Sequence, residues 1–248
     1  MPTRQPIATH LDNPFSDEEN DKALEKGKEG TSTGKDALPN EFLKRASHGA
    51  FRTAALATIN RVLQDGTEMP EWRDCVIVPV HKPKKSKLSC DSYRPVSLVN
   101  HFGKYVERLI FQRLLPYVMS IPDCIPDTQC GGMPSLGTVD AIHVTRTVSS
   151  SAHDHNVPLY KCYLDLTKAY DLVHRETLWQ ILEIHGIPPL LLRLIRNLFD
   201  GAEATIKVDG AKAHLPNNPP RIRHQTRLRS ITPTIQHLLW RPHCGDAT

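Results

Sequence analysis

No stretch of this sequence stays apolar for the roughly 20 residues that a bilayer-spanning helix needs. The N-terminus, MPTRQPIATHLDNPF, also lacks the apolar centre of a secretory signal peptide. These two absences predict an intracellular protein, in the nucleus or the cytoplasm, that has no membrane partner.

No CxxC pair occurs among the six cysteines, which are scattered as Cys75, Cys90, Cys124, Cys130, Cys162 and Cys244. This scatter argues against a zinc site and against a secreted disulfide framework, so reduced thiols are expected. The tightest histidine pair, His153 and His155, has no third ligand nearby, and a solvated loop is favoured there over a metal site.

The excess of positive over negative charge is also small, because 31 Lys and Arg stand against 27 Asp and Glu for a formal charge of +4. This balance is too even to identify an anionic partner, so any nucleic-acid argument must come from local clusters. A chain of 248 residues with 39% hydrophobic content is long enough to bury one good core.

Local patterns divide the chain into helices and strands. Residues 11–37 are charged and rich in Gly, Ser and Thr, which predicts a disordered lead-in over residues 1–33. Helical spacing is expected from Pro39 to Gly66, over 102–115, over 138–150 and from Arg175 onward, and strands over 75–80, 159–166 and 204–208. The irregular alternation favours an α+β fold over a doubly wound sheet.

The segment YLDLTKAYD, residues 163–171, carries the most informative chemistry. Asp165 leaves the end of an apolar strand, where a carboxylate can supply one hard oxygen ligand to magnesium. Asp165 or Asp171 can equally cap the segment that follows, and the residues alone leave both interpretations open.

Four segments, in order, resemble the non-LTR retrotransposon reverse transcriptases. TSTGKDALPNEFLK is similar to the family's entry segment, and PEWRDCVIVPVHKPKKSKLSCDSYRPVSLVNHFGKYVERLIFQRL to its fingers motifs. QCGGMPSLGTVDAI resembles the Gln-Cys-Gly stretch, and YLDLTKAYDLVHRETLW the first palm motif. The resemblance covers about residues 34–210 and implies an RNA-directed DNA polymerase with a right-hand fold.

The resemblance also implies roles for individual residues. Asp165 would be catalytic and would bind both Mg²⁺ ions, with the backbone carbonyl of Leu166 on one of them. Lys82 and Arg94 would hold the incoming deoxynucleotide triphosphate, and Tyr170 would lie under its sugar, unless its ring is only a packed core aromatic. The implied partners are an RNA template and a DNA primer, and no specific protein partner is inferred. For three further lysines, solvent exposure and phosphate contact remain equal alternatives: Lys84, Lys85 and Lys87.

The sequence departs from the family pattern at two places. Gly132, Met133 and Pro134 follow Gln-Cys-Gly where the family has an aromatic and a basic residue. No aromatic-x-Asp-Asp sequence follows Gly210, and two-metal transfer needs more than one carboxylate. We therefore expect this chain to be inactive alone, and the alternative is a non-catalytic nucleic-acid-binding or interaction module.

The resulting expectation is an incomplete right-hand polymerase in four parts. Residues 1–33 form the lead-in, 34–150 a fingers-like region, 151–212 a partial palm, and 213–248 a tail unlike the family. The tail has five Arg and no Lys from Pro219 onward, and a one-nucleotide shift can recode it into an apolar segment typical of the family. A reading-frame shift between about Asn217 and Leu228 is our hypothesis for its origin, which the coding DNA tests.

Overall fold

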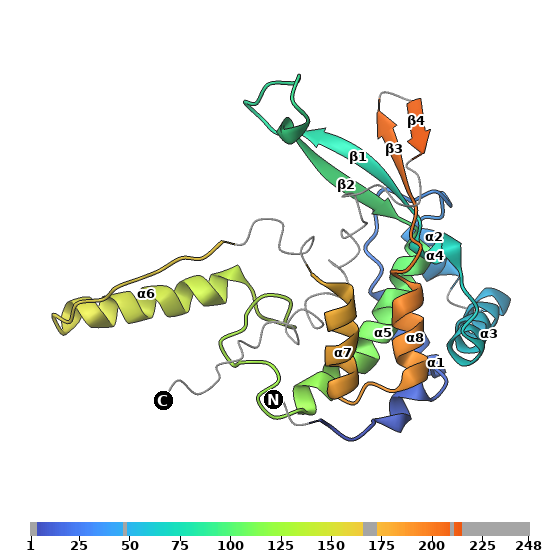
Figure 1. Cartoon of the computed structure of the whole chain (residues 1–248), viewed down its shortest axis with the longest axis horizontal. Helices are drawn as coiled ribbons and strands as arrows, with labels where there is room; N and C mark the ends of the chain where they lie inside the picture. Colours follow the sequence, from blue (N-terminus) through green and yellow to red (C-terminus); the bar gives the residue numbers. More distant parts are fainter. Residues whose placement is uncertain (1–3, 47–48, 166–172, 209–210, 215–248) are drawn as a thin grey trace.

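The computed structural model of the chain describes residues 4–46, 49–165, 173–208 and 211–214. Figure 1 shows a helical body, a β-hairpin that projects from one end of it, and helix α6, which points away from its side. The helices are η1 (Thr9–Asp12), α1 (Asp17–Glu25), α2 (Asn40–Arg45), α3 (Ala50–Asp65), α4 (Pro70–Arg73), η2 (Cys90–Ser92), α5 (His101–Ser120), α6 (Thr138–Asp154), α7 (Arg175–Ile184) and α8 (Pro189–Asn197). The strands are β1 (Cys75–His81), β2 (Tyr93–Val99), β3 (Ala204–Val208) and β4 (Ala211–His214).

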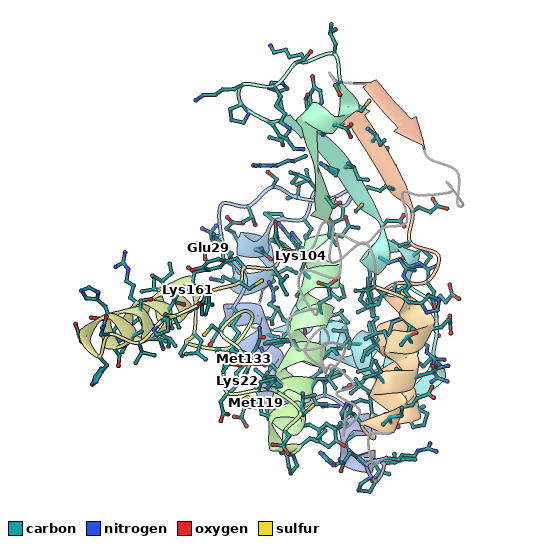
Figure 2. All side chains as sticks on the ribbon, turned by 60° about the vertical axis from the view of Figure 1, so that its left-hand side comes forward. Lys22, Glu29, Lys104, Met119, Met133 and Lys161 are labelled. Carbon is teal, nitrogen blue, oxygen red and sulfur yellow. The ribbon has the colours of Figure 1, made fainter. Side chains whose placement is uncertain are left out.

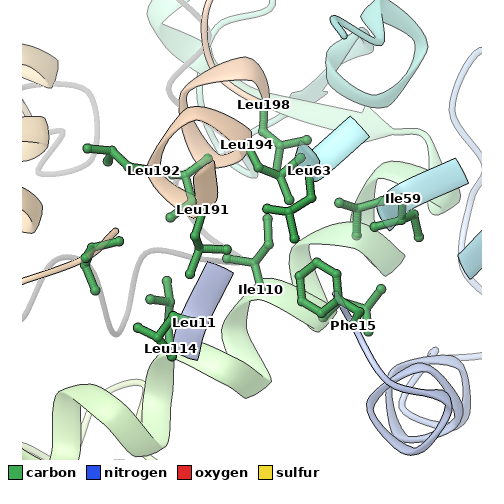
Figure 3. Packing of buried hydrophobic residues seen from close by; sticks show 14 of the residues in the cluster. Leu11, Phe15, Ile59, Leu63, Ile110, Leu114, Leu191, Leu192, Leu194 and Leu198 are labelled. Atoms are coloured by element: carbon green, nitrogen blue, oxygen red, sulfur yellow. The ribbon is translucent and has the colours of Figure 1, made fainter. Parts of the chain in front are cut away.

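One hydrophobic core lies inside the helical body. Helix α5 runs through it, and Figure 3 shows Ile110 and Leu114 of this helix among leucines of α8 and Ile59 and Leu63 of α3. Burying such side chains is the main favourable term in folding. The mixture of helices with one small sheet confirms the expected α+β class at this coarse level.

The N-terminal segment belongs to this core, so the expectation of a disordered lead-in is wrong for its described part. Leu11, Phe15 and Leu24 are buried, and α1 begins with a capping box between Ser16 and Glu19. The polar composition of the segment did not predict this order, because only a few apolar side chains, spaced far apart, dock on α5 and α8. The segment therefore gains its order from tertiary contacts.

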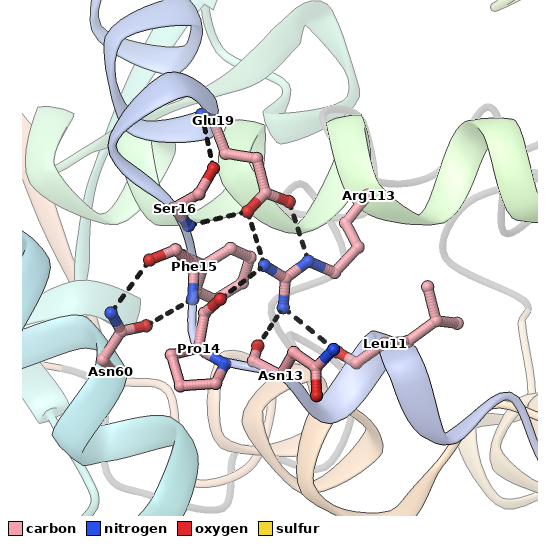
Figure 4. A network of polar contacts seen from close by, with 8 residues as sticks. All are labelled: Leu11, Asn13, Pro14, Phe15, Ser16, Glu19, Asn60 and Arg113. Atoms are coloured by element: carbon pink, nitrogen blue, oxygen red, sulfur yellow. Dashed lines mark hydrogen bonds and ion pairs between the residues drawn. The ribbon is translucent and has the colours of Figure 1, made fainter.

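Polar contacts hold the same segment in place, as Figure 4 shows around Arg113. The guanidinium of Arg113 pairs with Glu19 and donates to the carbonyl oxygens of Leu11, Asn13 and Pro14. It also lies over the ring of Phe15, 3.9 Å from the centroid. One buried cation on α5 thus satisfies backbone acceptors at the end of η1 and in the irregular segment that leads to α1.

The sheet has the order β2-β1-β3-β4. β1 pairs antiparallel with β2 along its whole length but parallel with β3 only from Cys75 to Ile77. Beyond Ile77, therefore, the hairpin is two-stranded. Pro79 lies opposite Pro95 in this part, where their missing N–H groups interrupt no ladder bond because the nitrogens face away from the partner strand.

Two further expectations about local structure need correction. The strand expected at 159–166 does not form over its described part: residues 157–165 are irregular, because no neighbouring strand offers them a hydrogen-bonded ladder within the described ranges. The helix expected from Pro39 to Gly66 is divided into α2 and α3, and Gly49, before α3, has φ +95°, which an L side chain rarely adopts. The strands expected at 75–80 and 204–208 and the helices expected at 102–115 and 138–150 are confirmed.

Helix α6 and the segment 157–165 form an arm, which we define as residues 138–165. The segment runs back beside α6, and Lys161 donates a hydrogen bond to Ser149. No residue of α6 is buried, and the large apolar side chains Val139, Ile142, Val144 and Val148 are exposed. No helix within the described ranges is both long and apolar enough to cross a membrane.

Candidate functional site

The hairpin β1–β2 carries two of the residues singled out from the sequence, Lys82 and Arg94. Arg94 lies in β2, directly opposite Val80. Lys82 follows β1 two residues after Val80, and its backbone N–H donates to the carbonyl of Ser92 at 2.7 Å. Because side chains alternate along a strand, Lys82 and Arg94 share one face as diagonal neighbours, about 7 Å apart at Cβ.

The local contacts of the two cations leave donors available. The ammonium of Lys82 donates to the backbone carbonyl of Asp91 at 2.7 Å, which restrains the side chain and leaves two of its three protons for an anion. Arg94 is exposed. The apolar side chains of Val80 and Val96 lie on the same face of the hairpin and are 48% and 41% exposed. A guanidinium on such a face offers paired donors to phosphate oxygens.

The loop between the two strands adds three more lysines, Lys84, Lys85 and Lys87, all exposed. Lys84 has φ +65°, so its backbone is in the left-handed region that non-glycine residues seldom adopt. The loop therefore gathers positive charge at the end of the hairpin farthest from the helical body (Figure 1).

Asp165 lies elsewhere, at the last described position of the arm, and is exposed. Figures 1 and 2 show the arm and the hairpin leaving the body in different directions, so Asp165 and the pair Lys82 and Arg94 belong to different projections of the chain. Leu166 and Tyr170 lie outside the described residues.

The arrangement around Asp165 does not by itself form a magnesium site. Within the described ranges, no three His, Cys, Asp or Glu side chains come close enough together to hold a metal ion. One carboxylate has the right chemistry for Mg²⁺ but supplies too few of the oxygen ligands that the ion needs. The metal assignment of Asp165 therefore stays a prediction.

Sequence reasoning overlooked one feature of the hairpin, the ring pair of His81 and Tyr93. These two residues are directly opposite each other at the end of the β1–β2 ladder, with centroids 5.2 Å apart and planes at 68°. Strand alternation places them on the face opposite Lys82 and Arg94. The register of the hairpin was the missing signal, because without it the two rings, far apart in sequence, cannot be paired.

Comparison with known proteins identifies the class to which this hairpin and helical body belong. The family described as "Reverse transcriptase (RNA-dependent DNA polymerase)" matches residues 80–225, more than half of the 248 residues. The chain belongs to the reverse transcriptase family. The match begins at Val80 in the hairpin and includes the arm, so both candidate regions lie within it.

The similar proteins point to a narrower class within this family, because they come from non-LTR retrotransposons. The RNA-directed DNA polymerase from mobile element jockey of Drosophila melanogaster is 30% identical over 183 residues, which are 73% of this chain and 20% of that protein. The jockey polymerase of Drosophila funebris is 28% identical over 81% of this chain and 22% of its own length. The probable RNA-directed DNA polymerase from transposon BS is 31% identical over 59% of this chain and 16% of its own. The chain thus spans about a fifth of the length of these relatives.

Proposed function

We propose that this chain provides the nucleotide-binding part of a retrotransposon reverse transcriptase, an incomplete right-hand polymerase made of fingers and the first part of the palm. In this proposal the hairpin β1–β2 holds the triphosphate of an incoming deoxynucleotide. The RNA template and DNA primer are the partners that the names of its relatives support.

The shared face of Lys82 and Arg94 is the observation that carries this proposal. An ammonium restrained by the Asp91 carbonyl and a guanidinium diagonal to it belong to the same face of a two-stranded tip. A triphosphate spreads its charge over several oxygens, so two adjacent cations with different geometries bind it better than either alone. Asp165, Leu166 and Tyr170 keep their proposed metal-binding and sugar-binding roles.

A triphosphate titration tests the role of Arg94. Replacing it in Arg94→Ala should weaken deoxynucleotide binding by about tenfold, the loss of one or two charge-assisted hydrogen bonds. Arg94→Lys should recover part of the affinity, since it keeps the charge but loses the paired geometry.

Arg61 is the matched control, because it is an exposed arginine on α3, away from the hairpin. Arg61→Ala should bind the triphosphate as the parent does. If Arg94→Ala also binds it as tightly as the parent, the proposed triphosphate site is wrong. The alternative of a non-catalytic nucleic-acid-binding module would then gain weight if the protein still binds nucleic acid with a steep salt dependence.

A further inference from the structure

The base of the hairpin packs as a unit of its own, apart from the main core. Its buried side chains, Cys75 and Ile77 of β1 and Val99 of β2, form a small cluster with Ala204 of β3. This cluster is distinct from the large one that fills the helical body. Burial of apolar side chains in a shared core therefore does not fix the hairpin on the body, and its orientation depends on other contacts at its base.

One short segment of the chain supplies such contacts. Residues 28–38, which we call the clasp, lie between α1 and α2, and Figures 1 and 2 show this segment, in blue, reaching the base of the hairpin. The ammonium of Lys35 pairs at 3.2 Å with Asp74, the residue just before β1. The backbone N–H of Asp36 donates at 3.3 Å to the side-chain oxygen of Asn100, the residue just after β2. The clasp thus holds both points at which the chain enters and leaves the hairpin.

Asn100 is the centre of this arrangement, because it is buried and both ends of its amide group are used. Oδ1 accepts the bond from Asp36, and Nδ2 donates to the backbone carbonyl of Glu71 in α4 at 2.6 Å. Gly34 lies so close that a Cβ atom there would be 2.6 Å from the backbone nitrogen of Asn100. Rotation of a side chain cannot relieve a contact with backbone, so the fit of the clasp requires glycine at position 34.

Asp74 extends the same arrangement to the third strand. Its Oδ1 atom accepts a hydrogen bond at 3.2 Å from the backbone N–H of Glu203, the residue just before β3, while Oδ2 pairs with Lys35. The side chains of Lys35 and Asp74 are 31% and 18% exposed, so water and salt screen this ion pair only in part. The clasp therefore reaches β1, β2 and β3 through two residues at their ends.

Polar contacts also hold the rest of the clasp. The ring of His101 lies 2.8 Å from the carbonyl oxygen of Leu38 and 3.3 Å from the hydroxyl of Thr31. Between Leu24 and Leu43 the structure describes no buried apolar side chain. Segments with few buried apolar contacts open at a smaller cost in free energy than the core does. The clasp can therefore be released while the helical body stays folded.

We propose that the clasp sets the orientation of the hairpin relative to the helical body, with Asn100 as the positioning residue. Release of the clasp lets the hairpin turn about its two ends, at Asp74 and Asn100. Lys82 and Arg94 both lie on the hairpin, so their mutual geometry does not depend on the clasp. The clasp instead controls where the hairpin carries a bound triphosphate, and in this respect the inference rests on the proposed function.

The distance between two spin labels in the full chain tests this control. One label is attached to Cys90, which is exposed in the loop of the hairpin, and the other to α3 through Arg61→Cys. Serine replaces three other cysteines: Cys130, Cys162 and Cys244. The parent should give one narrow distribution of distances by pulsed electron spin resonance. Gly34→Ala should shift and broaden it, because the added Cβ atom pushes the clasp away from Asn100.

Matched variants separate the clasp from a general loosening of the segment. Lys35→Ala should also broaden the distribution, and Lys35→Arg should restore it by keeping the charge. Lys44→Ala is the control, because Lys44 pairs with Glu29 of the same segment, likewise at 3.2 Å and with a side chain 30% exposed, but does not touch the hairpin. Lys44→Ala and the exposed change Ser32→Ala should leave the distribution as in the parent.

Hydrogen exchange distinguishes a change of orientation from damage to the hairpin. The amides of β1 and β2 should exchange in Gly34→Ala as they do in the parent, because the ladder between the strands is untouched. If Gly34→Ala melts at a lower temperature than the parent, Lys35→Ala gives a second measurement of the same clasp.

Two outcomes would overturn the proposal. One is a parental distance distribution in both Gly34→Ala and Lys35→Ala, and the other is faster exchange throughout β1 and β2 in these variants. The triphosphate titration of Arg94→Ala is independent of both measurements. A broadened distribution beside an Arg94→Ala variant that binds as the parent does would support the clasp and reject the proposed triphosphate site.

Discussion

Glu19 shows how one residue can link an N-terminal segment to the core. Its carboxylate receives hydrogen bonds from Arg113, whose side chain is 8% exposed, and from the backbone of Ser16. Burial opposes ionisation of Glu19, but the bonds from Arg113 and Ser16 outweigh it and lower the pKa of Glu19 below the ordinary 4.5. The folded state therefore favours the ionised form of Glu19.

This coupling predicts a pH-dependent stability. Because the folded pKa is depressed, the contribution of Glu19 is complete above pH 4.5 and is lost as the pH falls through the folded pKa. Glu19→Gln should be less stable than the parent at neutral pH, by about 1–3 kcal/mol for the lost charged hydrogen bonds. Urea unfolding of both proteins at a series of pH values should show the difference shrink below pH 4.5. A difference that stays constant down to the lowest pH at which both fold would contradict the assignment.

At the scale of elements, helix α1 depends on its partner α5. Helix α1 is polar on most of its surface, yet Ala23 and Leu24 are buried against the core that α5 crosses. A helix of nine residues is marginal in water without such packing. Its stability is thus a property of the pair of helices.

Leu24→Ala should consequently lower the free energy of unfolding by about 2–5 kcal/mol, the cost of a truncated core leucine. Leu24 is 1% exposed, whereas Ile7 in the same N-terminal segment is 54% exposed. Ile7→Ala is the matched control and should change stability by less than about 0.5 kcal/mol. Thermal melting of the three proteins measures both effects. Equal melting temperatures for Leu24→Ala and the parent would mean that this segment is dispensable after all.

At the scale of the whole molecule, the hairpin and the arm diverge from a common body (Figure 1). In a polymerase the residues that hold the triphosphate and the carboxylates that bind the metal ions must surround the same reacting phosphorus atom. The described residues hold Lys82 and Arg94 on the hairpin and Asp165 on the exposed arm, and no three His, Cys, Asp or Glu side chains gather among them to hold a metal ion.

We therefore predict that the chain of 248 residues incorporates no deoxynucleotide on a primed RNA template with magnesium or manganese. One aspartate cannot hold two cations about 4 Å apart against their mutual repulsion. Primer extension, with an active reverse transcriptase as the positive control, measures this directly. Incorporation that is abolished by Asp165→Ala would show that the chain assembles a working site.

Local sequence patterns predicted those parts of the fold that depend on near neighbours. The run CVIVPV predicted β1, and the apolar stripe that includes Tyr105 and Leu109 predicted α5, because strand and helix periodicities are short-range properties. The strand expected at 159–166 failed because a strand also needs a partner, and its edge is unpaired within the described residues.

The sequence by itself determined the family, since its ordered motifs require no knowledge of contacts, and it identified Lys82, Arg94 and Asp165 as the residues to examine. Only the tertiary structure decided which of them share a face and which lie apart. It also decided the order of the N-terminal segment, where Asp12 accepts a hydrogen bond from the backbone of Leu191, 179 positions later. Such long-range pairs have no local signal, because each forms only when the rest of the core has brought its two ends together.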